Sequence, residues 1–114
     1  MVTAIIHPGV FMVVILFRSK LAEAAADGYS EMASEMLARA QQMPGFIDFK
    51  SFKADDGERL SVIRWQDQAS LAGWRNDVRH LVAQKMGREK WYEYYKIEVA
   101  EIIRESAFER GSTH

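Results

Sequence analysis

Apolar residues recur along the chain with two different spacings, and the spacing changes in a regular order. Residues 10–17 form a short run of β-branched, aliphatic and aromatic side chains, which predicts a buried strand. Between Tyr29 and Met43, apolar residues recur every three or four positions, which predicts an amphipathic helix. Pro44 and Gly45 then end that helix. The first two predicted elements are therefore a strand and a helix.

Two short strands and a tight turn follow the predicted helix. Residues 46–53 and 60–65 are rich in β-branched and aromatic residues. The segment between them contains Asp56 and Gly57, a pair typical of hairpin turns. This pattern predicts an antiparallel hairpin.

The last third of the chain predicts two short helices and a final strand. The first helix covers residues 66–74 with Asp67 as its N-cap, and the second begins near residue 76 or 77 and ends around Gly87. Residues 95–104 then alternate in the manner of a strand.

The predicted order βαββαβ, with right-handed crossovers, indicates an α+β fold, a ferredoxin-like sandwich with its helices on one face of the sheet. The other face would expose side chains such as Phe11, Phe49 and Trp65, or their alternates along each strand. We expect a second copy to cover that face, so the chain would form a homodimer, a dimeric α/β barrel that encloses a cavity.

The length and the net charge of the chain limit its number of domains and its possible partners. With 114 residues, the chain has room for one core, which we place at residues 10–105, with a flexible lead-in at 1–9 and a tail at 106–114. Fifteen basic against sixteen acidic residues give a net charge of −1, which disfavours nucleic acid as a partner. The longest apolar run, at 10–17, is too short to cross a membrane, so we expect a cytoplasmic protein with no membrane partner.

The residue types also restrict the chemistry. The chain has no cysteine, which excludes disulfides, thiolate metal sites and cysteine nucleophiles. Its histidines and carboxylates show no metal-binding spacing, and Gly57, Gly73 and Gly87 stand alone rather than in a phosphate-binding loop. We therefore expect no metal and no bound cofactor.

Four stretches carry a resemblance to a known family. MPGF at 43–46, IRWQDQASLAGWRN at 63–76, HLVAQKMGREKWYEYY at 80–95 and IEVAEIIRE at 97–105 resemble the antibiotic biosynthesis monooxygenase family. Members form dimeric α/β barrels. They include cofactor-independent oxygenases of phenols and quinols, and also haem-degrading enzymes.

The resemblance implies roles for two residues. Trp74 matches the tryptophan that lines the substrate pocket, and His80 matches the position of an ionisable side chain in quinone-forming members. Haem-degrading members carry an Asn in the first strand and a ligating His ten residues after the Trp. Here residues 11–20 contain no Asn and the later position is Gln84, which disfavours haem degradation.

Cofactor-independent oxidation requires a base, because dioxygen reacts with phenols only once they are ionised. His80 is the best candidate, since an ordinary histidine titrates at a pKa of about 6.5 and the other two histidines lie near the ends. Arg64, Arg75 or Arg79 could stabilise the oxyanion. Helical spacing puts two further candidates for substrate binding, Asn76 and Gln84, on one stripe with His80, a stripe that could instead be solvated.

Three interpretations of function stay open. The first is a cofactor-independent monooxygenase that oxidises a small phenolic or quinol-like aromatic compound with dioxygen, with His80 and Trp74 as catalytic residues. The second is a non-catalytic barrel that binds a small molecule, in which Trp74 belongs only to the core. The third is a haem-binding or haem-degrading monooxygenase. The aromatic cluster Trp91, Tyr92, Tyr94 and Tyr95 is expected to pack in the dimer rather than against a ligand.

Overall fold

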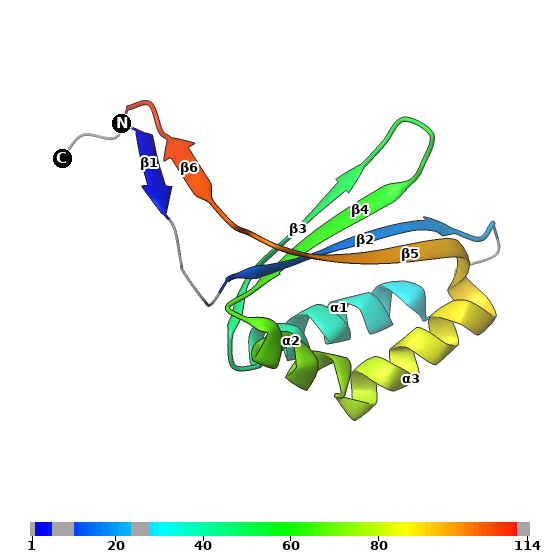
Figure 1. Cartoon of the computed structure of the whole chain (residues 1–114). Coiled ribbons are helices and arrows are strands. Elements are labelled where there is room, and N and C mark those ends of the chain that lie inside the picture. Colours follow the sequence, from blue (N-terminus) through cyan, green and yellow to red (C-terminus); the bar gives the residue numbers. More distant parts are fainter. Residues whose placement is uncertain (1, 6–10, 24–27, 112–114) are drawn as a thin grey trace.

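A four-stranded antiparallel sheet forms one layer of the protein, and three helices cover one of its faces (Figure 1). The computed structural model describes residues 2–5, 11–23 and 28–111, with the backbone alone for 2–5, 78, 79 and 81. The strands of this sheet are β2 (Val13–Leu21), β3 (Phe46–Lys53), β4 (Arg59–Trp65) and β5 (Tyr92–Glu101). The helices are α1 (Tyr29–Gln41), α2 (Gln68–Arg75) and α3 (Val78–Met86), and a π-helical turn, η1 (Gly87–Trp91), follows α3.

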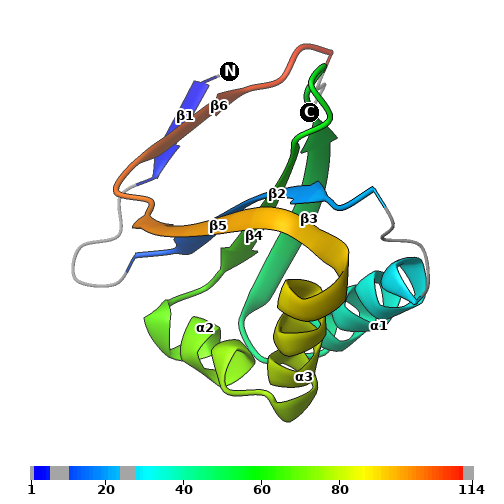
Figure 2. The same cartoon turned by 90° about the vertical axis from the view of Figure 1, so that its right-hand side faces the viewer.

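The topology confirms the predicted ferredoxin-like α+β fold. The strand order is β3-β4-β2-β5, so β2 lies between two strands that come much later in the chain. Figure 2 shows all three helices on the same side of the twisted sheet. Two βαβ-type connections of one hand produce this layered arrangement, as the element order predicts.

The central hairpin matches its prediction closely. β3 pairs with β4 from Phe46 opposite Trp65 to Lys53 opposite Arg59. Gly57 has φ +91°, a left-handed conformation that glycine adopts without strain. Two backbone hydrogen bonds close the turn: the Ala54 N–H donates to the Glu58 carbonyl, and the Gly57 N–H donates to the Ala54 carbonyl.

The two central strands differ from prediction. β2 covers Val13–Leu21 instead of residues 10–17, and its polar residues keep pairing: Arg18 and Ser19 with both β4 and β5, and Lys20 with β5. β5 correspondingly begins at Tyr92 instead of residue 95. α3 ends at Met86, next to Gly87 as predicted, but the unpredicted π-helical turn η1 follows directly. Gly87 is also closely packed, because a Cβ there would lie 2.7 Å from the Tyr92 ring.

The core lies at the end of the sheet where β2 starts. Val13, Trp65, Leu71 and Trp74 are buried there against Ala40 of α1. The Trp65 and Trp74 rings are stacked with their centroids 6.1 Å apart. α2 is therefore held to the sheet by two tryptophans.

We call the sheet surface that points away from the helices the open face. Ile15 and Phe17 point toward the helices, so the alternation along β2 puts Leu16 and Arg18 on the open face. The same alternation and the strand register define its members as Val14, Leu16, Arg18, Lys20, Asp48, Lys50, Phe52, Leu60, Val62, Arg64, Tyr94, Lys96, Glu98 and Ala100.

Phe49 and Trp65 were named as side chains that the uncovered face could expose, but both lie on the helix side of the sheet. The side chains that alternate with them along the strands lie on the open face instead. Trp65 is 0% exposed and Phe49 lines a cavity, so both lie on the helix side of the sheet. Phe52, in contrast, is 50% exposed on the open face. Phe11 precedes β2 and is half-buried.

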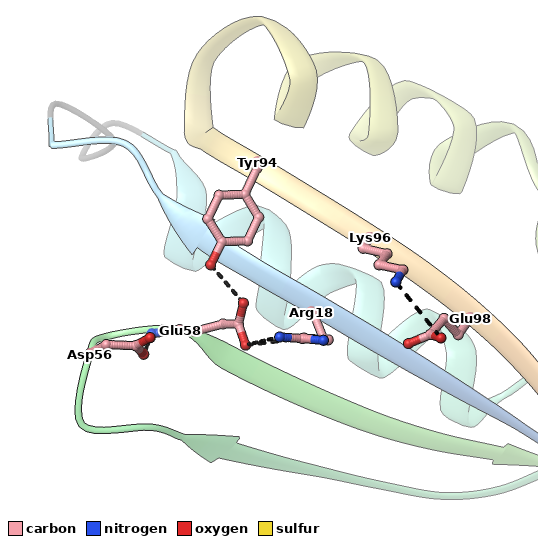
Figure 3. Close-up of polar contacts among 6 residues, drawn as sticks. All are labelled: Arg18, Asp56, Glu58, Tyr94, Lys96 and Glu98. Atoms are coloured by element: carbon pink, nitrogen blue, oxygen red, sulfur yellow. Dashed lines mark hydrogen bonds and ion pairs between the residues drawn. The ribbon is translucent and has the colours of Figure 1, made fainter.

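Polar contacts lie beside the hairpin turn and along β5 on the open face (Figure 3). Glu58 accepts hydrogen bonds from Arg18 Nη2 at 2.9 Å and from the Tyr94 hydroxyl at 2.6 Å. These bonds lower the pKa of Glu58, and the carboxylate raises the pKa of Tyr94 to about 12. Lys96 and Glu98 form a further ion pair at 3.9 Å.

A two-stranded arm extends from the sheet on the side away from the helices (Figures 1 and 2). It pairs β1 (Val2–Ile5) with β6 (Glu105–Phe108), antiparallel. These strands could not be predicted from the sequence, because four-residue strands carry too little periodicity. The domain boundaries at 10 and 105 stay predictions.

Candidate active site

The side chains of Trp74 and His80 stack on each other at the junction between α2 and α3. Their ring centroids are 4.3 Å apart and the ring planes differ by 18°. His80 Nδ1 lies 3.1 Å from the Trp74 carbonyl oxygen. Because a carbonyl oxygen only accepts, Nδ1 carries the proton in this hydrogen bond, and the neutral ring keeps its lone pair on Nε2.

Two aspartates shape this corner of the backbone. Asp67 caps α2 by accepting a hydrogen bond from the Ser70 backbone N–H at 2.8 Å, as the sequence predicts. Asp77 accepts from the His80 backbone N–H at 3.2 Å and from Arg39 Nε at 2.7 Å. The Asp77 carboxylate therefore holds the first turn of α3 against α1 and positions His80 beneath Trp74.

A cavity of about 650 Å³ lies between the sheet and the helices. This volume suits a small organic ligand, for which protein cavities typically measure about 300–1,000 Å³. Trp74 and His80 both line the cavity, next to Leu71 and Ala83. The two residues predicted as catalytic therefore share one compartment.

Of the four predicted substrate-binding residues, two line the cavity and two lie outside it. Arg75 and Gln84 line the cavity with His80. Asn76 caps the C-terminal end of α2 and is exposed outside the cavity lining. Arg64 lies on the open face, 3.3 Å from Asp48, because it alternates with the inward-facing Ile63. The expectation that Arg64 and Asn76 reach the cavity is thus not met, and the Arg79 side chain lies outside the described residues.

The cavity is also lined by polar residues that were not predicted as site residues. They are Ser19, Tyr29, Ser30, Ser34, Ser51, Arg59, Ser61, Tyr92 and Tyr95. In the aromatic cluster expected to pack in a dimer, only Tyr94 lies on the open face, whereas Trp91, Tyr92 and Tyr95 line the cavity. Alternation along each strand could have grouped these cavity residues on one face of the sheet, but only if the register of β5 against β2 had been known.

Burial changes the protonation of two groups in the cavity. It lowers the pKa of His80, because the charged imidazolium loses its hydration there. It raises the pKa of Tyr92, helped by a hydrogen bond with Tyr29. At neutral pH, both groups are therefore uncharged.

The described part of the chain has neither a group of metal-binding side chains nor a membrane-spanning helix. In residues 2–5, 11–23 and 28–111, no three histidines or carboxylates come together as a metal-binding group. Among the same residues, no helix has the length and apolar character needed to span a membrane.

Comparison with known proteins points to one family. Residues 12–86 match the family model described as antibiotic biosynthesis monooxygenase. The uncharacterized protein YqjZ of Bacillus subtilis is 33% identical over 85 residues, covering 75% of each chain.

Two further relatives have named activities. A protein of Pyricularia oryzae named jasmonate monooxygenase ABM is 28% identical over 93 residues, which cover 80% of this chain and 43% of that protein. The structure is similar to SnoaB of Streptomyces nogalater, described as a cofactor-independent oxygenase, with TM-score 0.66 and 14% identity over 79% of this chain and 91% of that one. At that identity, the likeness shows the fold alone.

Proposed function

The chain belongs to the antibiotic biosynthesis monooxygenase family, and on that premise we propose that it is a cofactor-independent monooxygenase. Its substrates are dioxygen and a small phenolic or quinol-like aromatic compound, bound in the cavity that Trp74 and His80 line. The observation that carries the proposal is the hydrogen bond of 3.1 Å between His80 Nδ1 and the Trp74 carbonyl. The names of SnoaB and of the Pyricularia oryzae relative are consistent with oxygenase chemistry.

His80 acts as the general base. Its Nδ1 proton is held by the Trp74 carbonyl, so Nε2 is the nitrogen that accepts the phenolic proton. Burial lowers the pKa of His80 and keeps the ring neutral at pH 7, which is the form that a base requires. Trp74 stacks on the imidazole and restricts its orientation.

Ionisation makes the substrate itself the electron donor. Once the phenol has lost its proton, the electron-rich ring reacts with dioxygen. One oxygen atom enters a ring carbon that loses its hydrogen, and the other leaves as water. The ring supplies all four electrons, so a phenol and dioxygen give a quinone and water without a further reductant.

Arg75 and Gln84 bind the oxygen atoms of the substrate. Both line the cavity with His80. The Arg75 guanidinium stabilises the phenolate that His80 creates, because a fixed positive charge beside an apolar cavity acts more strongly than it would in water. Gln84 supplies an amide for hydrogen bonds on the same helix as His80.

Oxygen uptake with a panel of hydroquinones tests this function. His80→Ala should reduce the rate by a factor on the order of ten or more, as loss of a general base does. Lys85→Ala is the matched control, since Lys85 is exposed on α3 outside the cavity lining, and it should keep the wild-type rate. An equal rate in His80→Ala removes His80 from the mechanism. No uptake by the wild type, with a higher Tm in the presence of phenols, would instead favour a binding protein without catalysis.

A second copy of the chain covers the open face in this proposal. Phe52, Leu16 and Val62 form its apolar part, and no helix of the described chain packs there. The ion pairs of Arg18 with Glu58 and of Lys96 with Glu98 leave charges of both signs around that part. Two identical faces of mixed charge can pack about a twofold axis, which closes a homodimeric barrel.

A further inference from the structure

The sheet surface of the cavity changes from apolar to polar along the direction of β2. Three successive rows of side chains cross the strands on the helix side, and each row follows from the pairing register. The first row is apolar, with Phe49, Ile63, Ile15 and Val99; the second is mixed, with Ser51, Ser61, Phe17 and Ile97; the third is polar, with Lys53, Arg59, Ser19 and Tyr95. All of these residues except Lys53 line the cavity.

The polar row lies at the opposite end of the cavity from His80. Trp74 stacks on Trp65, which pairs with Val13 at the start of β2, so the apolar row is the one nearer His80. Ser19 is four residues beyond Ile15, a separation of about 13 Å along a strand. One elongated ligand could therefore contact both ends.

The hydroxyl groups at the polar end are placed to donate hydrogen bonds to a ligand. Ser19 is only 3% exposed, and it lines the cavity. The Tyr95 hydroxyl accepts from Arg88 Nη1 at 3.3 Å, which leaves its own proton available.

Arg59 adds a positive charge to these donors. It pairs with Ser19 across β4 and β2, and it lines the cavity. In the described residues it takes part in none of the ion pairs, which join Arg18, Arg39, Arg64 and Lys96 to acids. A guanidinium with adjacent hydroxyl donors and no carboxylate partner is complementary to an anionic oxygen group.

We propose that the polar end of the cavity, formed by Arg59, Ser19 and Tyr95, binds the carboxylate of an aromatic carboxylic acid. The apolar body of the ligand then lies along the first two rows toward Trp74. That the oxidised ring is the end beside His80 rests on the proposed function, whereas binding of the carboxylate does not.

Calorimetric titration with two ligands of the same shape tests the proposal. Para-coumarate carries a phenol at one end and a carboxylate at the other, and para-coumaryl alcohol replaces the carboxylate with an uncharged hydroxymethyl group. The wild type should bind the acid more tightly. Arg59→Gln should weaken binding of the acid by a factor on the order of ten, typical of a lost charge-assisted hydrogen bond, and leave the alcohol nearly unaffected.

Lys53→Gln is the matched control. Lys53 pairs with Arg59 across the hairpin and carries the same charge, but it does not line the cavity. The Lys53→Gln variant should therefore leave binding of the acid unchanged.

Ser19→Ala removes a buried hydroxyl without removing charge. Like Arg59→Gln, it should weaken binding of the acid.

Several binding results would overturn the proposal: no binding of the acid, equal affinity for acid and alcohol, equal losses for both ligands in Arg59→Gln, or an equal loss in Lys53→Gln. Failure of the oxygenase function gives a different result. The acid would then bind in an Arg59-dependent manner while neither ligand supported oxygen uptake. Oxygen uptake that needs His80 but is indifferent to Arg59 and to the carboxylate would reject this proposal alone.

Discussion

His80 shows how one hydrogen bond can decide the chemistry of a residue. Histidines are often general bases, but only a neutral ring with a free nitrogen can accept a proton. Here the Trp74 carbonyl assigns the proton to Nδ1, and burial lowers the pKa of the ring. The sequence indicated the residue, whereas the tautomer follows only from the fold.

The pH dependence of the rate should follow the titration of His80. Protonation removes the base, so kcat/KM for a hydroquinone should fall as the pH drops through the pKa of the free enzyme. Because burial lowers this pKa, the midpoint of the fall should lie below about 6.5, the ordinary value for histidine. A midpoint at or above that value would contradict the assignment.

The free energy of unfolding gives an independent check of the lowered pKa of His80. Below about pH 6.5, the unfolded chain binds a proton at His80 more readily than the folded chain does, so the free energy of unfolding should decrease as the pH falls. Urea denaturation of the wild type and His80→Gln measures the contribution. The variant should lose less stability over this range, and parallel curves would show that His80 is not shifted.

At the scale of secondary structure, two glycines with positive φ have different roles. Gly45 has φ +85°, and a Cβ there would collide with the side chain of Ser70 in α2. Gly57 has φ +91° in the hairpin turn, with open space around it. The turn before β3 is therefore packed against the first turn of α2, whereas the hairpin turn is free.

Alanine substitutions should separate these two roles. Gly57→Ala should cost about 1 kcal/mol of the free energy of unfolding, the price of a left-handed alanine. Gly45→Ala adds a steric collision to the same backbone penalty, and should cost about 3 kcal/mol. Urea denaturation measures both values. Equal losses would show that the contact between Gly45 and Ser70 does not constrain the fold.

The elements that the sequence predicted well are those whose pattern is local. α1 begins at Tyr29 and β3 covers Phe46–Lys53, as expected from helical spacing and from the hairpin turn. β2 was misplaced because its polar residues at 18–20 look like a strand end, although neighbouring strands keep them paired. η1 was missed because Gly87 serves a contact with Tyr92 that spacing does not show.

For the whole molecule, the open face is the surface on which the proposed dimer depends. Val62→Asp would place a charge in its apolar part, and should convert a dimer to a monomer in analytical ultracentrifugation. Val82→Asp is the control, because Val82 is 42% exposed on α3, away from that face, and should leave the mass unchanged. A wild type that sediments as a monomer, or a Val62→Asp variant that stays dimeric, would reject packing through the open face.

By itself, the sequence determined the order of the four main strands and of the helices α1, α2 and α3. It also determined the hairpin, the amphipathic face of α1 and the family, because each of these is encoded in nearby residues. Only the tertiary structure decided which side of each strand meets the helices, and so which side chains meet in the cavity. It removed Arg64 and Asn76 from the predicted site and brought Ser19, Arg59 and Tyr95 together from three strands. The physical reason is that strand register joins residues far apart in the chain, and periodicity within one strand carries no information about it.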